Sequence, residues 1–208
     1  IEGGGFSLDG EEPDCDITAM AVQALAGYLD QSEVKAAVDR ALDVLSYMQK
    51  TDGTFTSWGT KNAESICQVI VALTARGIDP ATDSRFVKNG MAVLDALASF
   101  YVDGGGFRHT ASGELDGMAT EQGYYALAAY YRFAAGQTNL FNMSDVTIQA
   151  NTPATPDQPG SPDNPDTPAN PDNPGTAEPT GDTILLWAIL APAAFLAAAA
   201  LIRKKKQA

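Results

Sequence analysis

Basic residues are scarce in this 208-residue sequence, which has 13 lysines and arginines, one histidine, and 26 aspartates and glutamates. The formal net charge is −13, even though four basic residues are concentrated at 203–206. An acidic chain is not attracted to nucleic acid or to anionic lipid, so we expect no nucleic-acid partner. The excess of acidic residues is typical of a domain that stays soluble at a crowded surface.

The segment from 152 to 182 lacks aromatic and basic residues altogether and has a proline every few positions. Such a segment cannot bury enough apolar surface to offset the entropy that it would lose on ordering. The composition therefore predicts a disordered linker, rich in Pro, Asp and Asn, over 151–182. One domain, at 1–140, remains in front of this linker.

Charge is missing from residues 184–202, which are followed directly by the basic cluster. A helix of this length covers about 28 Å, close to the hydrocarbon thickness of a bilayer. We therefore expect a transmembrane helix at 183–202. The basic tail at 203–208 predicts a cytoplasmic C-terminus and an extracellular N-terminal domain, as in a single-pass protein of the cell membrane.

Cysteine is rare as well, with only Cys15 and Cys67. Outside the cell a disulfide between them would persist. Both lie near the starts of expected helices, so a disulfide and two free, buried thiols remain open, and the free thiols are favoured.

Three glycine-rich loops divide the first part of the chain into repeats. They read GGGF at 3–6, QKTDGTF at 49–55 and VDGGGF at 102–107. A helix with a small residue followed by leucine comes after each loop, and the leucines of these pairs are 48 and 54 residues apart. A period of this size is expected of stacked helical hairpins.

Hydrophobic periodicity predicts five helices, at 17–28, 34–48, 66–73, 86–101 and 123–131. The first is expected to bury Ile17, Met20, Ala21, Ala24, Leu25 and Tyr28. The second is expected to bury Val34, Val38, Ala41, Leu42, Leu45 and Met48, and the fourth Val87, Met91, Leu94, Leu97 and Tyr101. The third and fifth are apolar nearly all round and are expected to be buried on all sides. This alternation predicts two concentric layers of helices, the inner one lining a central space.

The loop QKTDGTF matches the Gln-x-x-x-Gly-x-Phe/Trp signature of the prenyltransferase and squalene-cyclase repeat. Over residues 1–133 the loops and their helices resemble successive hairpins of an α/α-toroid, which implies an all-α fold containing part of such a toroid. Tyr101 stands at the Gln position of the third loop, and in the first loop that position falls just before Ile1. We therefore expect the domain to be truncated at its N-terminus, and the chain to be the C-terminal part of a longer, exported surface protein.

The stretch PDCDITAM at 13–20 resembles the Asp-x-Asp-Asp-Thr-Ala motif of class II terpene cyclases, in which an aspartic acid protonates the substrate. The resemblance makes Asp16 the general acid and Asp14 its companion, while Ile17 replaces the last aspartate of the motif. A simpler interpretation is favoured. Asp is a preferred helix N-cap, so Asp14 or Asp16 would cap the helix that follows, as Asn62 would cap the third.

Two ligands are known from related toroids. Protein prenyltransferases bind zinc through an Asp-x-Cys pair and a distant histidine, and this chain offers Asp14, Cys15 and His109. The order of these residues departs from that pattern, so we predict no metal site and no cofactor. Cobalamin carriers are also α/α-toroids, but no residue here points to cobalamin.

Polar residues near the starts of two inner helices are expected to ring one mouth of the central space. A few polar groups beside an aromatic side chain are typical of a ligand site. The candidate ligand-binding residues are Glu64, Gln68, Glu121 and Gln122, with Trp58, Arg108 and His109 from the neighbouring loops. A role in tethering adjacent hairpins is an equally good interpretation of these loop residues.

The segment EPTGD at 178–182 resembles the Leu-Pro-x-Thr-Gly signal of Gram-positive sortases, although it lacks the leucine and the residue between Pro179 and Thr180. The resemblance implies a Gram-positive surface protein, with sortase and peptidoglycan as possible partners through Thr180. A helix that stays in the membrane is the other alternative, and both remain open.

Three functions are compatible with these patterns. The first is an anchored extracellular toroid module that binds a small-molecule or surface ligand without catalysis. The second is an enzyme of the terpene-cyclase type with Asp16 as general acid, and the third is an adhesin or structural stalk. The first is favoured, and the sequence leaves open whether the protein is an enzyme.

Overall fold

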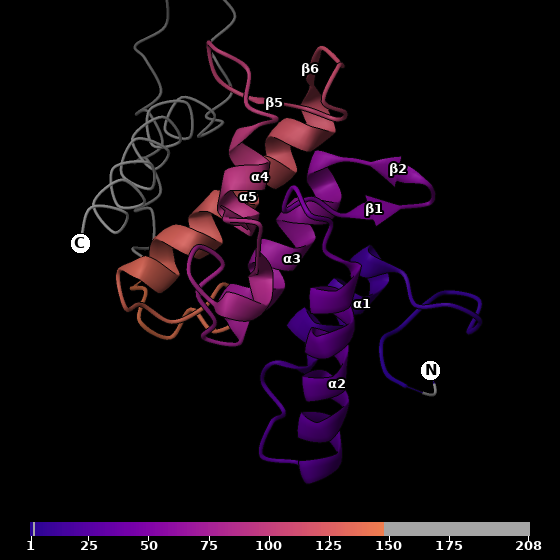
Figure 1. Ribbon diagram of the computed structural model, residues 1–208. Helices are drawn as coiled ribbons and strands as arrows, with labels where there is room; N and C mark the ends of the chain where they lie inside the picture. The colour runs from indigo at the N-terminus through magenta and orange to yellow at the C-terminus, as the bar shows by residue number, and fades with distance from the viewer. Residues whose placement is uncertain (2, 148–208) are drawn as a thin grey trace, which may run out of the picture.

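The computed structural model describes Ile1 and residues 3–147. They are mainly helical, as predicted, and contain α1 (Cys15–Leu25), α2 (Ser32–Met48), α3 (Ala63–Ala75), α4 (Val93–Ala98) and α5 (Gly117–Ala134) (Figure 1). The predicted linker at 151–182, the predicted membrane helix at 183–202, the basic tail and the EPTGD segment lie outside the described residues. Within the described part of the chain, no helix has the length and apolar character needed to cross a membrane.

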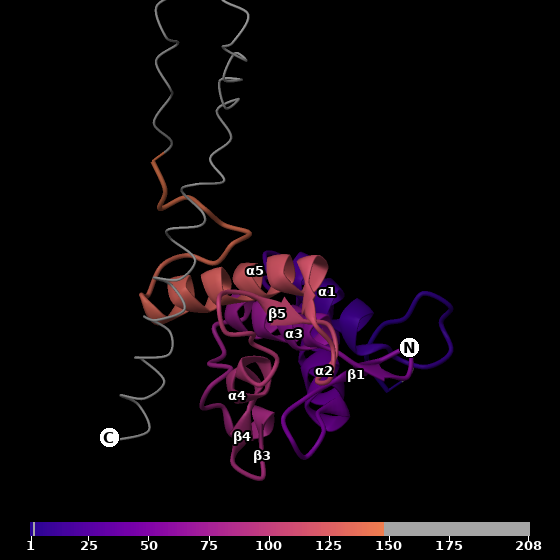
Figure 2. The same cartoon turned by 90° about the horizontal axis from the view of Figure 1, so that it is seen from above.

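The helix α3 lies at the centre of the fold. It packs against both α1 and α5, while α2 packs on α1 and α4 packs on α3. Figure 2 shows α2 and α4 on the same side of the row formed by α1, α3 and α5. The helices that follow the three glycine-rich loops therefore form one layer, and the two intervening helices form the other.

In the described part of the chain, three short antiparallel hairpins connect the helices, and none of them was predicted. They are β1 (Thr56–Ser57) with β2 (Thr60–Lys61), β3 (Val87–Lys88) with β4 (Met91–Ala92), and β5 (Phe107–Arg108) with β6 (Leu115–Asp116). Each hairpin directly precedes a helix, and the first and third occupy the loops in which ligand-binding residues were expected.

The predicted helix at 86–101 is wrong over its first half. Only Val93–Ala98 is α-helical within this range; a 3-10 helix at Ser84–Phe86 overlaps its start, and Val87 and Met91 belong to the strands β3 and β4. Asn89 and Gly90 form the turn, with φ of 49° and 80°. Two successive left-handed residues favour a hairpin, and Asn-Gly is the strongest sequence signal for it.

The predicted buried face of α1 is also wrong. The structure buries Cys15, Thr18, Ala19, Val22 and Gln23. Met20 is instead 51% exposed and Tyr28, beyond the end of the helix, 56%. The prediction failed because Thr18 and Gln23 are polar residues that are buried with hydrogen-bond partners. Counting them as solvent-facing placed the buried face on the wrong side of the helix.

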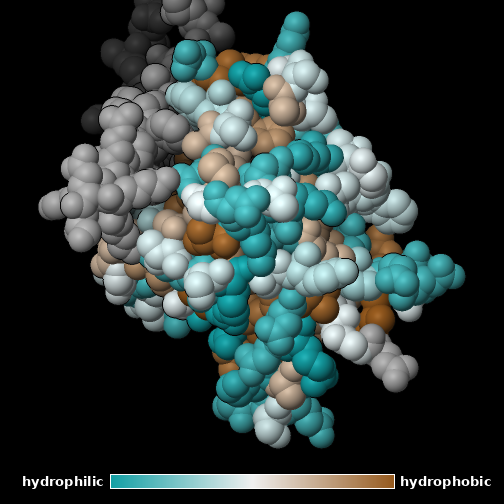
Figure 3. All heavy atoms as spheres, in the orientation of Figure 1, coloured by the Kyte–Doolittle hydropathy of each residue, from teal (hydrophilic) through white to brown (hydrophobic). Residues whose placement is uncertain are grey.

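The predicted apolar face of α2 is confirmed, since Val38, Ala41, Leu42 and Leu45 are buried. On the face drawn in Figure 3, the side chains over α2 are mostly hydrophilic. The helix α3 is buried along nearly its whole length, as predicted. The predicted segment 123–131 of α5 is not buried on all sides, because Tyr131 is 43% exposed and Tyr124, Tyr125 and Ala128 are half-buried.

The first and third glycine-rich loops make the same contact with the helices that follow them, and the second loop is held in a different way. The hydroxyl of Thr18 accepts a bond from Phe6 N at 2.9 Å and donates to Phe6 O at 3.1 Å. Thr120 makes the same pair of bonds with Phe107, at 2.9 and 3.3 Å. In the second loop Gln49 of the repeat signature donates to Gly53 O at 3.2 Å and to Phe86 O at 3.0 Å. The loops are thus fixed onto the helices by side-chain bonds to the backbone.

The carboxylate of Asp52 in the second loop makes part of the fold stability depend on pH. Burial acts to raise the pKa of Asp52, but hydrogen bonds from Lys61 and Thr54 lower it to about 2, from an ordinary value of 3.8. A carboxyl group with a lowered folded-state pKa stabilises the fold above pH 4, and this stabilisation is lost as the pH falls towards 2.

We expect Asp52→Asn to lower the free energy of unfolding at neutral pH by about 1 kcal/mol, a value reduced because the side chain is half exposed. At pH 2, where Asp52 is half protonated in the folded protein, most of this difference should have disappeared. Urea unfolding at pH 2, 4 and 7 measures this, and a difference that stays constant with pH would count against the account.

Candidate functional site

Asp14 is the N-cap of α1, as the simpler interpretation of PDCDITAM predicted. Its Oδ1 accepts bonds from Asp16 N at 2.9 Å and Ile17 N at 3.1 Å, and its Oδ2 accepts one from the Ser57 hydroxyl at 2.7 Å. A carboxylate at this position satisfies free amide groups of the first turn and interacts favourably with the helix dipole. Both oxygens of Asp14 are therefore engaged in structure.

Asp16 lies in the first turn of α1 and is half-buried. Its Oδ1 accepts a bond from Cys15 Sγ at 3.4 Å, and the same thiol lies 3.4 Å from Thr56 O. The residue after Asp16 is Ile17, so no carboxyl group stands next to it on its C-terminal side. In general acid catalysis a neighbouring group sets the acidity of the proton donor. The neighbour that the cyclase motif supplies is thus replaced here by an alkyl chain.

Asp14, Cys15 and Asp16 place one possible ligand atom each within 4.8 Å of one another. The group fits zinc poorly. Burial, with help from the charge of Asp16, raises the pKa of the Cys15 thiol, whereas zinc binds the thiolate. Both oxygens of Asp14 already accept hydrogen bonds, and His109, the third residue of the zinc comparison, pairs with Glu64 instead.

Both cysteines are buried free thiols, which is the alternative that the sequence favoured. Burial raises the pKa of Cys67 well above its ordinary value. Two neutral thiols within the core pack as small apolar side chains.

Three glutamines form a row of hydrogen bonds across the neighbouring helices α1, α3 and α5. Gln23 Nε2 donates to Gln68 O and to Gln68 Oε1, both at 2.9 Å. Gln68 Nε2 donates in turn to Gln122 Oε1 at 3.1 Å. The row joins α1, α3 and α5 side by side and fixes the orientation of each amide.

One helical turn nearer the N-termini lie Met20, Glu64 and Met118, which share a face with the three glutamines because residues three or four apart are neighbours on a helix. We call these six residues the glutamine face. Met20 and Met118 are 51% and 66% exposed. Two exposed, adaptable thioether side chains therefore flank a fixed row of amides.

Glu64 and His109 lie together at the N-terminal end of this face. Both carboxylate oxygens of Glu64 are 2.9 Å from His109 Nδ1. The backbone adds a second link, since Ala63 N donates to His109 O at 3.0 Å. The third loop is thus tied to the start of α3, which agrees with the tethering interpretation of this histidine.

Tyr125 and Glu121 extend the polar character of α5 beside the glutamine face. Burial, and next to it the charge of Glu121, raises the pKa of the Tyr125 phenol. Tyr125 therefore remains a neutral hydrogen-bond donor at physiological pH. Glu121 is exposed and Gln122 is half-buried.

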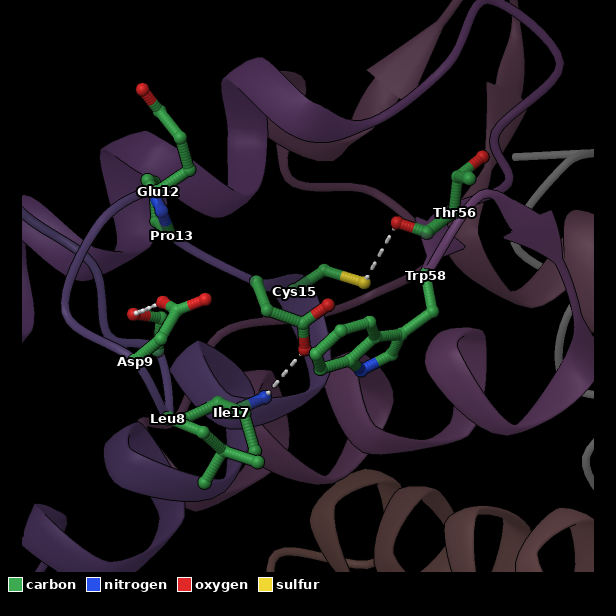
Figure 4. Close-up of a pocket in the computed structure, with 10 residues that line it drawn as sticks. Leu8, Asp9, Glu12, Pro13, Cys15, Ile17, Thr56 and Trp58 are labelled. Atoms are coloured by element: carbon green, nitrogen blue, oxygen red, sulfur yellow. Dashed lines mark hydrogen bonds between the residues drawn. The ribbon is translucent and has the colours of Figure 1, made fainter.

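Two of the loop residues predicted to bind ligand lie elsewhere. Arg108 turns back on its own loop, where its guanidinium donates to Ala111 O at 3.2 Å and to Tyr101 O at 3.4 Å. Trp58 lines a hollow together with residues of the loop before α1 (Figure 4), and no other residue predicted to bind ligand lines that hollow. The structure thus brings Glu64, His109, Gln68 and Gln122 together, but not Trp58 or Arg108 with them.

Three members of the glutamine face were not predicted to bind ligand: Met20, which was expected on the buried face of its helix, Met118 and Gln23. Gln23 is only 7% exposed. A buried glutamine inside an apolar helix needs a partner, and this was the available signal. The identity of the partner depends on how α1 and α3 lie beside each other, which the sequence does not give.

No family model, curated protein or solved structure matches this chain. The likeness to the toroid repeat therefore rests on the sequence signature alone. Chemically, the glutamine face offers oriented amides, one carboxylate in contact with an imidazole, and exposed methionines. Such a surface can hold a molecule by hydrogen bonds and apolar contact.

Proposed function

We propose that residues 1–140 form an extracellular module of the α/α-toroid type that binds a small molecule or surface ligand on its glutamine face without catalysing a reaction. The anchor belongs to the same proposal. It is a membrane helix at 183–202 or attachment to a Gram-positive cell wall, and it is supported by the sequence pattern.

The observation that carries the proposal is the glutamine row between exposed methionines. Side chains that are fixed by mutual hydrogen bonds lose little conformational freedom when a ligand binds, which favours affinity. Met20 and Met118 add apolar contact that adapts to the shape of the ligand.

The runner-up, a terpene-cyclase-type enzyme with Asp16 as general acid, has less support. Asp14, its motif companion, is engaged as an N-cap and by Ser57. The adhesin or stalk alternative requires no bound small molecule, and the following test distinguishes it from the proposal.

We expect the full-length chain to retain a small molecule of defined mass in native mass spectrometry after exposure to an extract of the medium of its own organism. Met118→Glu should lower the retained fraction by about tenfold, because a charge replaces an apolar contact at the glutamine face. Tyr47→Glu is the matched control, since Tyr47 is 91% exposed on α2. A chain that retains nothing, or equal losses in the two variants, would favour the stalk.

A further inference from the structure

The hollow that Trp58 lines lies at the start of α1 and shares no residue with the glutamine face. Its volume is about 260 Å³, and the loop before α1, the first turn of α1 and the β1–β2 hairpin form its walls (Figure 4). The volume is below the range of drug-sized pockets, so the hollow suits a small group rather than an extended ligand.

Acidic side chains dominate the polar part of the wall, namely Asp9, Glu12 and Asp14. Among the described residues that line the hollow, none is Lys, Arg or His. The Asp9 carboxylate accepts bonds from Glu11 N at 3.1 Å and from the Ser7 hydroxyl at 2.9 Å, and these bonds lower its pKa. Asp9 is therefore ionised at neutral pH. The hollow is a region of negative potential into which an anion would not enter.

Trp58 forms the aromatic part of the wall, with Leu8 also at the rim. The two side chains are 79% and 77% exposed. In Figure 4 the indole of Trp58 lies beside the first turn of α1. Among aromatic side chains, tryptophan attracts a cation to its ring face most strongly.

The backbone holds Trp58 in this position at a cost in stability. Trp58 has φ of 48° and Gly59 has φ of 77°, and together they form the turn between β1 and β2. In such a turn Asn or Gly is preferred, because a bulky L-residue is strained in the left-handed region. Neither the strain nor the exposed indole is explained by stability, and both would follow if the indole contacts a ligand.

We propose that this hollow binds an organic ammonium cation, with the indole of Trp58 against its alkyl groups and the carboxylates of Asp9 and Glu12 balancing its charge. Asp14 adds negative charge, but its oxygens are engaged by Asp16, Ile17 and Ser57. A bare metal ion would have few free oxygen ligands here, and the indole would not coordinate it. A neutral sugar would stack on the indole without using the charge.

The test compares choline with 3,3-dimethylbutan-1-ol, which has the same shape without the charge, by NMR or calorimetric titration of the full-length chain. We expect choline to bind with an affinity at least about fivefold higher than that of the neutral alcohol, the factor typical of one cation–π contact. Raising the salt concentration from about 20 mM to about 500 mM should reduce this difference.

Trp58→Leu and Asp9→Asn should each weaken choline binding by about fivefold while leaving the far-ultraviolet circular dichroism unchanged. Tyr47→Leu removes an aromatic side chain that is 91% exposed on α2 and should leave binding unchanged. Equal affinity for choline and the alcohol, no choline binding, or full binding by both Trp58→Leu and Asp9→Asn would overturn the proposal. Binding of a neutral sugar in preference to choline would also overturn it.

Discussion

Gly123→Ala is expected to lower the free energy of unfolding by about 2 kcal/mol, although alanine is the better helix former. A Cβ at Gly123 would lie 2.2 Å from Cδ2 of Phe107, which is fully buried. Phe107 is the aromatic residue of the third glycine-rich loop, and Thr120 holds its backbone. The new methyl group would therefore separate α5 from this loop, and the ring has no free space to move into.

Gly117→Ala is the matched control for this prediction. Gly117 begins the same helix, and a Cβ there would meet no atom within 4 Å. By helix propensity alone we expect this variant to be as stable as the parent or slightly more stable. Denaturant unfolding of both variants gives the comparison. A Gly123→Ala variant at least as stable as Gly117→Ala would contradict the close packing of Phe107 on α5.

Asp14→Ala is expected to lower the free energy of unfolding by about 2 kcal/mol, at the upper end of the effect of a lost N-cap. The reason is that Asp14 serves two amide groups of α1 and also the Ser57 hydroxyl of the β1–β2 hairpin. Asp14→Asn should recover most of the loss, because asparagine caps a helix about as well as aspartate. Thermal or urea unfolding of the two variants measures the difference.

Asp16→Asn separates capping from catalysis in the same stretch. Within the described part of the chain, the Asp16 side chain accepts one weak bond, from the neighbouring Cys15 thiol, so its replacement should change stability by less than about 0.5 kcal/mol. If the folded variant loses the ability to turn over a polyprenyl substrate that the parent converts, the binding-module proposal fails. If Asp14→Ala proves as stable as the parent, the capping assignment fails.

The helix cap in the stretch PDCDITAM could be predicted from the sequence. A carboxylate one residue before a helix has a physical role that needs no knowledge of the rest of the fold. Asp14 or Asp16, and Asn62, were accordingly predicted as caps; Asp14 is the one that caps α1, and Asn62 Oδ1 accepts a bond from Ser65 N at 2.7 Å. Local chemistry was sufficient at both positions.

Helix faces could be predicted only where one stripe of apolar residues stands alone. In α2, charged residues mark the outer face, so the buried stripe is unambiguous. In α1, apolar residues occur on nearly every side, and Thr18 and Gln23 are buried because they find partners on Phe6 and Gln68. The choice of face there depends on neighbours distant in the sequence.

The errors in the loops have a different cause. Asn89-Gly90 is a local hairpin signal that the apolar stripe of 86–101 obscured. Trp58-Gly59 forms a similar turn, but tryptophan is an unusual residue at its first position, so the usual residue signal for this turn is missing. The separation of Trp58 from Glu64 and Gln122 follows from the direction of the β1–β2 hairpin, which no spacing along the chain reveals.

The most direct test of the ligand-binding account is amide hydrogen exchange of the full-length chain, measured with and without the small molecule that it retains. The account predicts slower exchange around Gln68 and Gln122 and in the loop of His109, with no change in α2. Exchange that is unchanged throughout α1, α3 and α5, or slowed only in α2 and α4, would contradict it.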